Sequence, residues 1–181
     1  MAAGRDVRHV LPPLRREARE VFIPAELFYG TAPGAGADPT KGLTSQSPRW
    51  RFSATTRQGV CAEVRLPGDR VPGTPVRFRF VYSVPTGPGG GWIMWRLDYL
   101  AVGNGEDVTG TAAVRTVRAP APAPNIVAES DPIEIPASEL DGKAEPVVLQ
   151  LGIIRYADDA GDTEASDADL YGLRMEYTAY V

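Results

Sequence analysis

The chain has 181 residues, a formal net charge of −4 and a sequence pI near 5.1, with 43% hydrophobic and 23% charged residues. This length and composition suffice for one domain with a core of its own. The acidic balance argues against non-specific nucleic-acid binding, which needs a positive field. No apolar run approaches the ~20 residues of a membrane span, and the first residues lack the apolar core of a secretory signal. We therefore expect a protein made in a cytoplasm, with neither a nucleic-acid nor a membrane partner.

Residues 1–46 predict an extended N-terminal arm and linker. Residues 14–20 form a short charged helix candidate, and Pro13 precedes it where a missing N–H costs nothing. Residues 29–48 are rich in Gly, Ala and Pro and follow no helical or strand period. Between these two stretches lies an apolar island of Val21, Phe22, Ile23, Leu27 and Phe28. We expect this island to dock on the domain or on a neighbour, and to anchor the protein to a partner.

Residues 47–181 predict an antiparallel β domain. Apolar residues alternate with polar ones in about eight segments, which is typical of half-buried strands. Turn-rich Gly and Pro stretches separate these segments. We therefore predict an all-β fold, a two-sheet sandwich and most specifically a jelly roll. The expected strands lie within residues 50–55, 60–66, 76–84, 92–101, 111–117, 125–136, 146–155 and 170–181.

The residue types that usually carry catalysis are sparse. Cys61 is the one cysteine, and its place in an expected strand indicates a structural thiol. His9 is the one histidine and lies in the arm, so Ser–His–Asp, Cys–His and zinc sites have no rigidly held histidine. Three strand acids, Glu63, Asp98 and Glu176, fall on different strands, and nothing in the sequence shows that any two of them meet. We expect no catalytic residue, no cofactor and no metal site.

An acidic loop follows the seventh expected strand. Its carboxylates are Asp158, Asp159, Asp162, Glu164, Asp167 and Asp169. Their spacing does not match an EF-hand, although calcium does bind such oxygen-rich segments. We favour a structural loop, fixed by an ion pair between Arg155 and Asp162 and by Thr163 capping a turn. A calcium site and a catalytic role stay open as alternatives.

The C-terminal stretch resembles a block found in virion proteins of tailed bacteriophages and prophages. In that block a strand ends in Arg, an acidic Asp-Thr loop follows, and the last strand ends in Glu-Tyr. The matching positions here are Arg155, Asp162, Thr163, Glu176 and Tyr177. Earlier strands of the family look like the segments that contain Trp50, Pro67, Gly91, Trp92 and Trp95. The resemblance covers residues 48–181 and implies a jelly-roll module on a capsid or tail, often oligomeric and often joined to the virion by an N-terminal arm.

The sequence therefore favours a non-enzymatic virion protein, either a capsid decoration (cement) protein or the base of a head fibre. We expect it to bind the major capsid protein or another virion protein through its arm, and to form a homo-oligomer, with a trimer favoured. The alternative is a carbohydrate-binding module of a tail fibre or tailspike, with Trp92, Tyr82 and Tyr180 as candidate exposed aromatic residues. A β-sandwich hydrolase is disfavoured, because the strand acids are unpaired and no rigid histidine is present.

Overall fold

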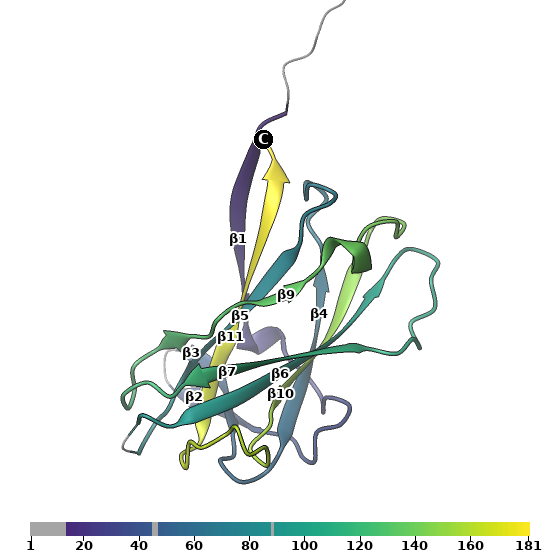
Figure 1. Ribbon diagram of the computed structural model, residues 1–181. Helices are drawn as coiled ribbons and strands as arrows, with labels where there is room; N and C mark the ends of the chain where they lie inside the picture. The colour runs from purple at the N-terminus through teal and green to yellow at the C-terminus, as the bar shows by residue number, and fades with distance from the viewer. Residues whose placement is uncertain (1–13, 45–46, 88) are drawn as a thin grey trace, which may run out of the picture.

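The computed structural model of the chain describes residues 14–44, 47–87 and 89–181. In this part of the chain two antiparallel sheets pack face to face, and the helical turns are two short 3-10 segments, η1 (Ala25–Leu27) and η2 (Ala137–Glu139). The all-β, two-sheet sandwich expected from the sequence is confirmed (Figure 1). None of the described helical segments has the length and apolar character needed to cross a membrane.

The seven-stranded sheet comprises β1 (Arg16–Pro24), β2 (Thr40–Thr44), β3 (Ser47–Phe52), β5 (Val76–Ser83), β8 (Ala128–Glu129), β9 (Ile133–Ile135) and β11 (Ala168–Tyr180). β11 is its central strand. It pairs with β5 along one edge, and along the other edge with β3 near its start and with β1 over most of its length. β2 extends the sheet beyond β3, while β8 and β9 both pair with β5.

The four-stranded sheet comprises β4 (Gln58–Arg65), β6 (Trp92–Val102), β7 (Ala113–Pro120) and β10 (Val148–Arg155), in the order β4–β10–β6–β7. Its neighbouring strands are antiparallel throughout. Because successive side chains of a strand point to opposite faces, the alternating apolar residues of these strands gather on the face that covers the core.

Trp95 of β6 lies at the centre of the core between the two sheets. Phe80 stacks on it with ring centroids 5.1 Å apart, Phe52 meets it edge-on at 5.3 Å, and Tyr82 tilts against it at 5.9 Å. Aromatic pairs in such geometries add to the free energy of burial. Tyr82 is therefore not an exposed aromatic residue, and its expected place in a glycan-binding surface is wrong. Its hydroxyl donates to the Pro120 carbonyl at 2.6 Å.

The N-terminal segment is where the structure departs most from the sequence-based expectation. The sequence predicts a helix over residues 14–20, but residues 16–24 form β1, which pairs with β11 from Arg16 opposite Tyr180 to Pro24 opposite Gly172. The helix prediction is wrong because β11 offers the backbone a long partner, and such tertiary pairing overrides helix propensity.

The expected domain boundary at residue 46 falls within a strand pair. β2 and β3 lie on either side of it and pair with each other in an antiparallel ladder. The described part of the predicted arm therefore belongs to the sandwich. Residues 1–13, which include His9 and Pro13, lie outside the described residues.

The chain between β1 and β2 also packs on the sandwich. Ile23 and Phe28 are buried in its core. After η1, residues 29–37 follow β4, where Tyr29 and Cys61 exchange backbone hydrogen bonds at 2.9 and 2.8 Å. The Gly- and Pro-rich stretch thus satisfies its backbone against the edge of the four-stranded sheet, which the absence of a periodic pattern in the sequence concealed.

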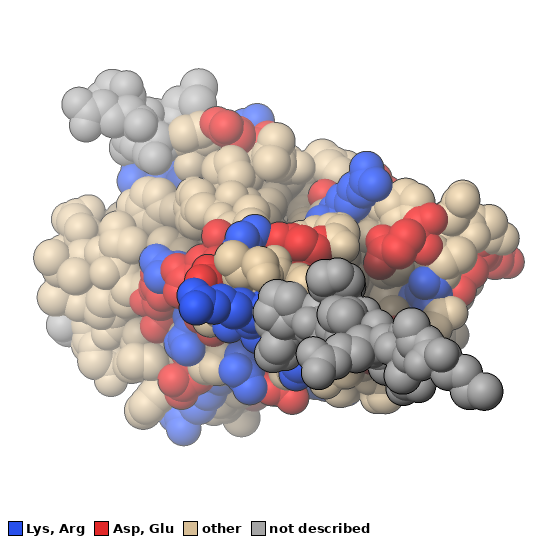
Figure 2. All heavy atoms as spheres, turned by 90° about the horizontal axis from the view of Figure 1, so that it is seen from above, with Lys and Arg blue, Asp and Glu red and all other residues tan. Residues whose placement is uncertain are grey.

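β1 and the end of β11 project together from the body of the sandwich (Figure 1). Seen from this end, basic and acidic side chains lie interleaved and form no broad region of one sign (Figure 2). One ion pair at this end joins Arg19 on β1 to Asp69 in the loop after β4, at 2.5 Å.

Candidate functional site

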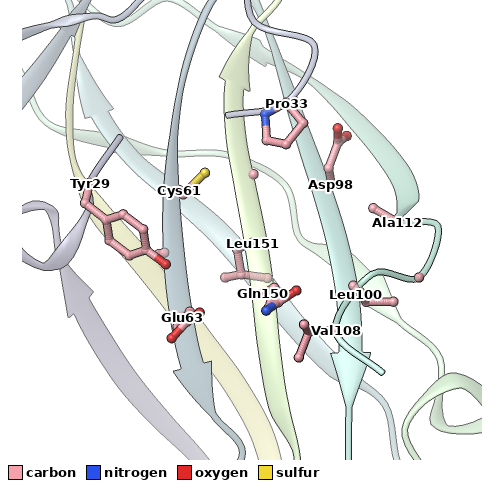
Figure 3. Close-up of a pocket in the computed structure, with 13 residues that line it drawn as sticks. Tyr29, Pro33, Cys61, Glu63, Asp98, Leu100, Val108, Ala112, Gln150 and Leu151 are labelled. Carbon is pink, nitrogen blue, oxygen red and sulfur yellow. The ribbon is translucent and has the colours of Figure 1, made fainter. Parts of the chain in front are cut away.

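A groove of about 300 Å³ lies on the outer face of the four-stranded sheet (Figure 3). Side chains of β4, β6 and β10 form its floor. One wall is the loop after η1, with Tyr29 and Pro33, and the other is the loop between β6 and β7, with Val108 and Ala112. Two loops raised over one sheet face thus create a concave surface of the size that small ligands use.

Two of the three strand acids line this groove. Glu63 projects from β4 and Asp98 from β6, while β10 runs between them and places Gln150 opposite Glu63. The third acid, Glu176, lies on the other sheet and pairs with Arg79 at 2.6 Å. The sequence could not show that any two acids meet, because the strand that joins Glu63 to Asp98 comes from a third part of the chain.

The two groove acids differ in their partners. Both oxygens of Asp98 accept hydrogen bonds from Arg96, whose Nη2 lies 2.7 Å from Oδ2. Arg96 also donates to the Tyr156 hydroxyl. Of the two acids, only Asp98 has an ion-pair partner among the described residues. Two-carboxylate glycoside hydrolysis uses two acids that face the sugar, and one of these two, Asp98, is held by Arg96.

The remaining polar groups of the groove are neutral. Burial, and after it the charge of Glu63, raises the pKa of the Cys61 thiol. The same two causes, in the same order, raise the pKa of the Tyr29 hydroxyl. Because a thiolate is the reactive form of cysteine, a protonated Cys61 is a poor nucleophile. Among the described residues, the groove thus combines a carboxylate that makes no ion pair, Glu63, with hydrogen-bonding groups and apolar surface.

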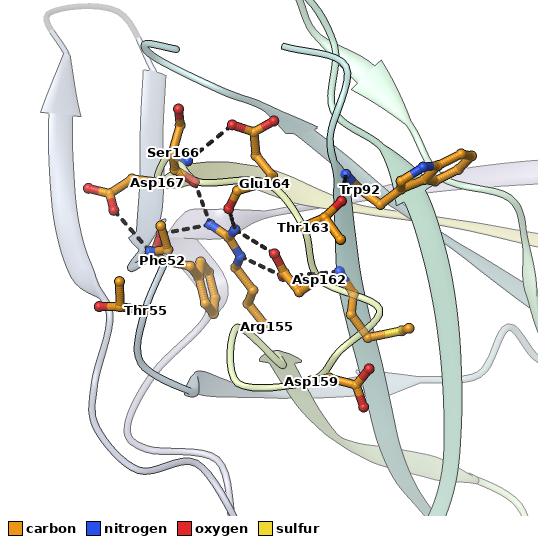
Figure 4. A network of polar contacts seen from close by, with 12 residues as sticks. Phe52, Thr55, Trp92, Arg155, Asp159, Asp162, Thr163, Glu164, Ser166 and Asp167 are labelled. Atoms are coloured by element: carbon orange, nitrogen blue, oxygen red, sulfur yellow. Dashed lines mark hydrogen bonds and ion pairs between the residues drawn. The ribbon is translucent and has the colours of Figure 1, made fainter. Parts of the chain in front are cut away.

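The acidic loop between β10 and β11 is built around a buried guanidinium. Arg155 has no exposed side-chain surface, and its Nε and Nη2 each donate to Asp162 at 2.9 Å (Figure 4). Its Nη1 donates to the Ser166 carbonyl and its Nη2 to the Glu164 carbonyl, both at 2.8 Å. The predicted ion pair is present. Because a buried charge must have its donors satisfied, the loop folds around this side chain.

Asp162 and Thr163 also tie the loop to β6. Asp162 Oδ2 accepts from the Met94 N–H at 3.1 Å, and Thr163 Oγ1 accepts from the Trp92 N–H at 3.0 Å. Thr163 was expected to cap a turn within the loop, but its hydroxyl reaches the first residue of a neighbouring strand instead. The turn is closed by Asp159, which accepts from the Gly161 N–H at 2.7 Å.

Each of the six loop carboxylates has its own partner, and no two share one. Asp158 pairs with Arg57, which lowers the pKa of that carboxyl. No group of three potential metal ligands converges anywhere in the residues that the structure describes. These contacts agree with the structural interpretation of the loop, in which each carboxylate is held by a group of the same chain. The other partners are the Gly161 N–H for Asp159, Arg155 for Asp162, the Ser166 N–H for Glu164, the Ala54 N–H for Asp167, and Arg49 with Arg51 for Asp169.

Comparisons with known proteins find similarity in structure and not in sequence. No family model and no curated protein matches the chain. Among solved structures, the C-terminal CBM6 of LamC, a marine laminarinase from Zobellia galactanivorans, matches with 12% identity and a TM-score of 0.44, covering 87% of this chain and 98% of that one. The VP2 subviral particle of infectious bursal disease virus matches with 13% identity and a TM-score of 0.43, covering 99% of this chain and 37% of that one.

A third match is the insecticidal delta-endotoxin Cry8Ea1 of Bacillus thuringiensis, with 13% identity and a TM-score of 0.42, covering 81% of this chain and 23% of that one. The chain thus spans well under half of the viral and toxin proteins. Similarity at this level adds nothing to the two-sheet β-sandwich described above. The bacteriophage family expected from the C-terminal block is not identified by these comparisons.

The predicted arm anchor is divided by the fold. Ile23 and Phe28 belong to the core, whereas Val21, Phe22 and Leu27 are exposed. Sequence reasoning also missed Leu14, which is exposed at the start of this segment. No local signal separates the buried members from the exposed ones, because burial depends on β11 and on the opposite sheet.

The two remaining candidates for a glycan-binding aromatic surface are exposed but lie on different strands. Trp92 begins β6 and carries Arg118 over its ring, 4.5 Å from the centroid. Tyr180 ends β11, next to the start of β1. They come from different sheets, so the predicted aromatic surface is not formed.

Proposed function

We propose that this protein is a non-enzymatic structural protein of a bacteriophage virion, either a capsid decoration (cement) protein or the base of a head fibre. The positions that carry the resemblance to phage virion proteins support this proposal. Arg155, Asp162 and Thr163 build the end of the sandwich and are saturated by contacts within the chain. Trp95 is the centre of the core. The residues shared with those virion proteins therefore hold the sandwich together, as expected of a structural protein.

The observation that carries the attachment proposal is the set of exposed apolar side chains on the N-terminal segment. Val21, Phe22 and Leu27 face solvent, while Ile23 and Phe28 fasten the same segment to the core. Exposed apolar side chains gathered on one segment mark interaction sites. Because the segment is fixed at both ends, these side chains reach a partner without first being ordered, which favours affinity.

The partner in this proposal is the major capsid protein or another virion protein. Burying one Leu or Phe side chain contributes roughly 1.5–3 kcal/mol. Several copies attached to one particle add their contributions. A small set of exposed apolar side chains is therefore sufficient for retention on a virion.

Replacing Leu27 tests this proposal. Leu27 is 60% exposed, so Leu27→Asp should fold normally, and we expect it to reduce the number of copies bound to particles that lack this protein by about 10-fold or more. The matched control is Ile126→Asp, at a side chain 57% exposed in the loop between β7 and β8. Phe28 is unsuitable for this test because it is buried. Wild-type binding by Leu27→Asp would remove this segment as the attachment site.

The alternative function, a carbohydrate-binding module of a tail fibre or tailspike, is favoured by the groove and not by the aromatic residues first expected. Tyr29, Glu63 and Gln150 supply an aromatic wall and hydrogen-bonding groups in one concavity. A glycan array with the wild type and Tyr29→Ala separates the two functions. Glycan binding that Tyr29→Ala abolishes would favour the module, and absence of binding would favour the structural protein.

A further inference from the structure

β1 has an open edge. In the described part of the chain it pairs with β11 alone, and its residues from Arg16 to Phe22 are exposed. Open edges of this length offer unpaired N–H and C=O groups to another strand. The projection of β1 from the sandwich leaves this edge free of neighbouring elements (Figure 1).

The direction of the backbone groups on this edge follows from two contacts. The Arg15 carbonyl accepts from the Val181 N–H at 2.9 Å, and a Cβ built on Gly172 of β11 would collide with the Ile23 carbonyl oxygen. Odd-numbered residues of β1 therefore direct their backbone groups toward β11. Because these directions alternate along a strand, the residues that present N–H and C=O to the open edge are Leu14, Arg16, Ala18, Glu20 and Phe22.

The charges of this edge are complementary about Ala18, because residues at equal distances on either side of it carry opposite charges. The sequence Arg-Glu-Ala-Arg-Glu occupies residues 16–20. If a second copy of the strand is laid antiparallel with Ala18 opposite Ala18, Arg16 faces Glu20 of the other copy and Glu17 faces Arg19. The two-fold axis repeats each of these pairs. Opposite charges directly across two strands stabilise the pairing, and an isologous contact requires this kind of self-complementarity.

The apolar residues fit the same register. Leu14 then faces Phe22 of the second copy, and both side chains are exposed in the single chain, at 67% and 52%. All three even-numbered pairings have their backbone groups directed at the open edge, so they would be the hydrogen-bonded pairs of the new ladder. Charge, apolar surface and backbone direction thus agree on one register.

We propose that β1 is a homodimer interface, in which two copies pair their β1 strands antiparallel about Ala18 and join their seven-stranded sheets into one. This goes beyond the proposed function, which gives the protein a different partner on the virion. Of the exposed residues assigned to that partner, Phe22 falls within the dimer contact, whereas Leu27 lies outside β1. It also replaces the favoured trimer with a two-fold contact. The occupant of the edge is a second copy of this chain, because the charges and the apolar residues of β1 complement themselves in this register.

Two contacts within the chain use the same charges. Arg19 lies 2.5 Å from Asp69, and Glu20 lies 3.1 Å from Arg174. Both pairs are exposed, so they hold their side chains weakly. A guanidinium has five donors and a carboxylate two acceptor oxygens, which lets each group keep its present contact and gain one across the interface.

Charge-swap variants test the register. Arg16→Glu with Arg19→Glu gives an acidic edge, and Glu17→Arg with Glu20→Arg gives a basic edge. Either variant places like charges opposite each other at positions 16, 17, 19 and 20, so we expect a dimer weakened by about 10-fold or more. An equimolar mixture of the two should restore the dimer, because every acidic position then faces a basic one. Analytical ultracentrifugation measures all three samples.

Exchanging all four charges within one chain is the matched control. This variant keeps the net charge and the charge complementarity about Ala18, and it carries Arg16→Glu, Glu17→Arg, Arg19→Glu and Glu20→Arg. This variant should dimerise like the wild type. Monomeric wild type up to about 100 μM, a trimer, or dimers unaffected by either two-charge variant would overturn the proposal.

If a charge variant fails to fold, hydrogen exchange of the wild type tests the β1 dimer contact instead. The amides of Ala18 and Glu20 point to the open edge, so their protection should rise with protein concentration. The amides of Glu17 and Arg19 already face β11 and should change little. Equal exchange of all four amides at every concentration would exclude the β1 pair. No particles are needed, so this proposal and the virion proposal can fail separately.

Discussion

β11 begins between β3 and β5 and ends in a projecting ribbon that it forms with β1, and the charged residues of these two regions differ in their burial. At its start, Asp169 is fully buried and lies 2.8 Å from Arg51 and 3.1 Å from Arg49. At its end, β1 is the partner strand, and Arg19 and Glu20 on β1 make only exposed ion pairs. One strand thus joins a region whose charges are fixed to a region whose charges are accessible.

This difference in burial separates the ion pairs that stabilise the fold from those that are free to contact a partner. Breaking a buried pair leaves an uncompensated charge away from water, and this is strongly destabilising. Breaking an exposed pair exchanges it for contacts with water at little cost. The start of β11 is therefore committed to one structure, whereas the charges near its end can be redirected to a second molecule.

The largest effect is expected where the acidic loop meets β10. Asp162→Ala removes the partner of the fully buried Arg155, and the free energy of unfolding should fall by about 3–5 kcal/mol. Urea denaturation at neutral pH measures this loss. The matched control is Asp158→Ala in the same loop, whose partner Arg57 is partly exposed, and there we expect a loss of about 0–1 kcal/mol. Equal losses in the two variants would contradict the distinction between committed and accessible charges.

A smaller effect is expected at Gly172, where the buried half of β11 passes into the ribbon. A Cβ there would collide with the Ile23 carbonyl oxygen and lie 2.7 Å from the Phe22 ring, so β1 must move away to accommodate it. Gly172→Ala should lower the free energy of unfolding by about 1–3 kcal/mol and speed hydrogen exchange of the β1 amides that face β11. Thermal denaturation together with exchange detects both changes.

Gly68→Ala is the control for this substitution. It lies in a loop where no atom comes within 4 Å of the new Cβ. Removing a glycine at such a site restricts the unfolded chain and does not strain the folded one, so stability should be kept or slightly raised. If Gly172→Ala behaves in the same way, β1 is held less closely to β11 than the structure indicates.

The sequence predicted the buried parts of this comparison better than the exposed ones. Strand alternation identified the sandwich because burial of one face imposes a period of two. The pair of Arg155 and Asp162 was predictable because its members lie seven residues apart and an arginine at the end of an apolar strand needs a nearby acid. Both signals are local in the chain.

The parts that were missed depend on residues far apart in sequence. The charged residues of β1 favour a helix in isolation, and only β11, more than 140 residues later, makes them a strand. Glu63 and Asp98 line one groove because β10 places their strands on either side of it. The open edge of β1 has no sequence signal of its own. The complementary charges about Ala18 can be recognised only after residues 16–24 are known to form a strand.

The smallest expected effect is the pH dependence of the stability contributed by the ion pair of Arg57 and Asp158. The hydrogen bond from Arg57 lowers the pKa of Asp158 from its ordinary value of 3.8. The folded state therefore favours the charged carboxylate, and the stabilisation is present above the ordinary pKa and lost as the pH falls through the lowered one. The difference in melting temperature between the wild type and Asp158→Ala should be largest near pH 6 and should vanish by about pH 2. A difference that persists at the acidic end would mean that Asp158 supports the loop through packing, so that even the accessible charges of this loop are committed to the fold.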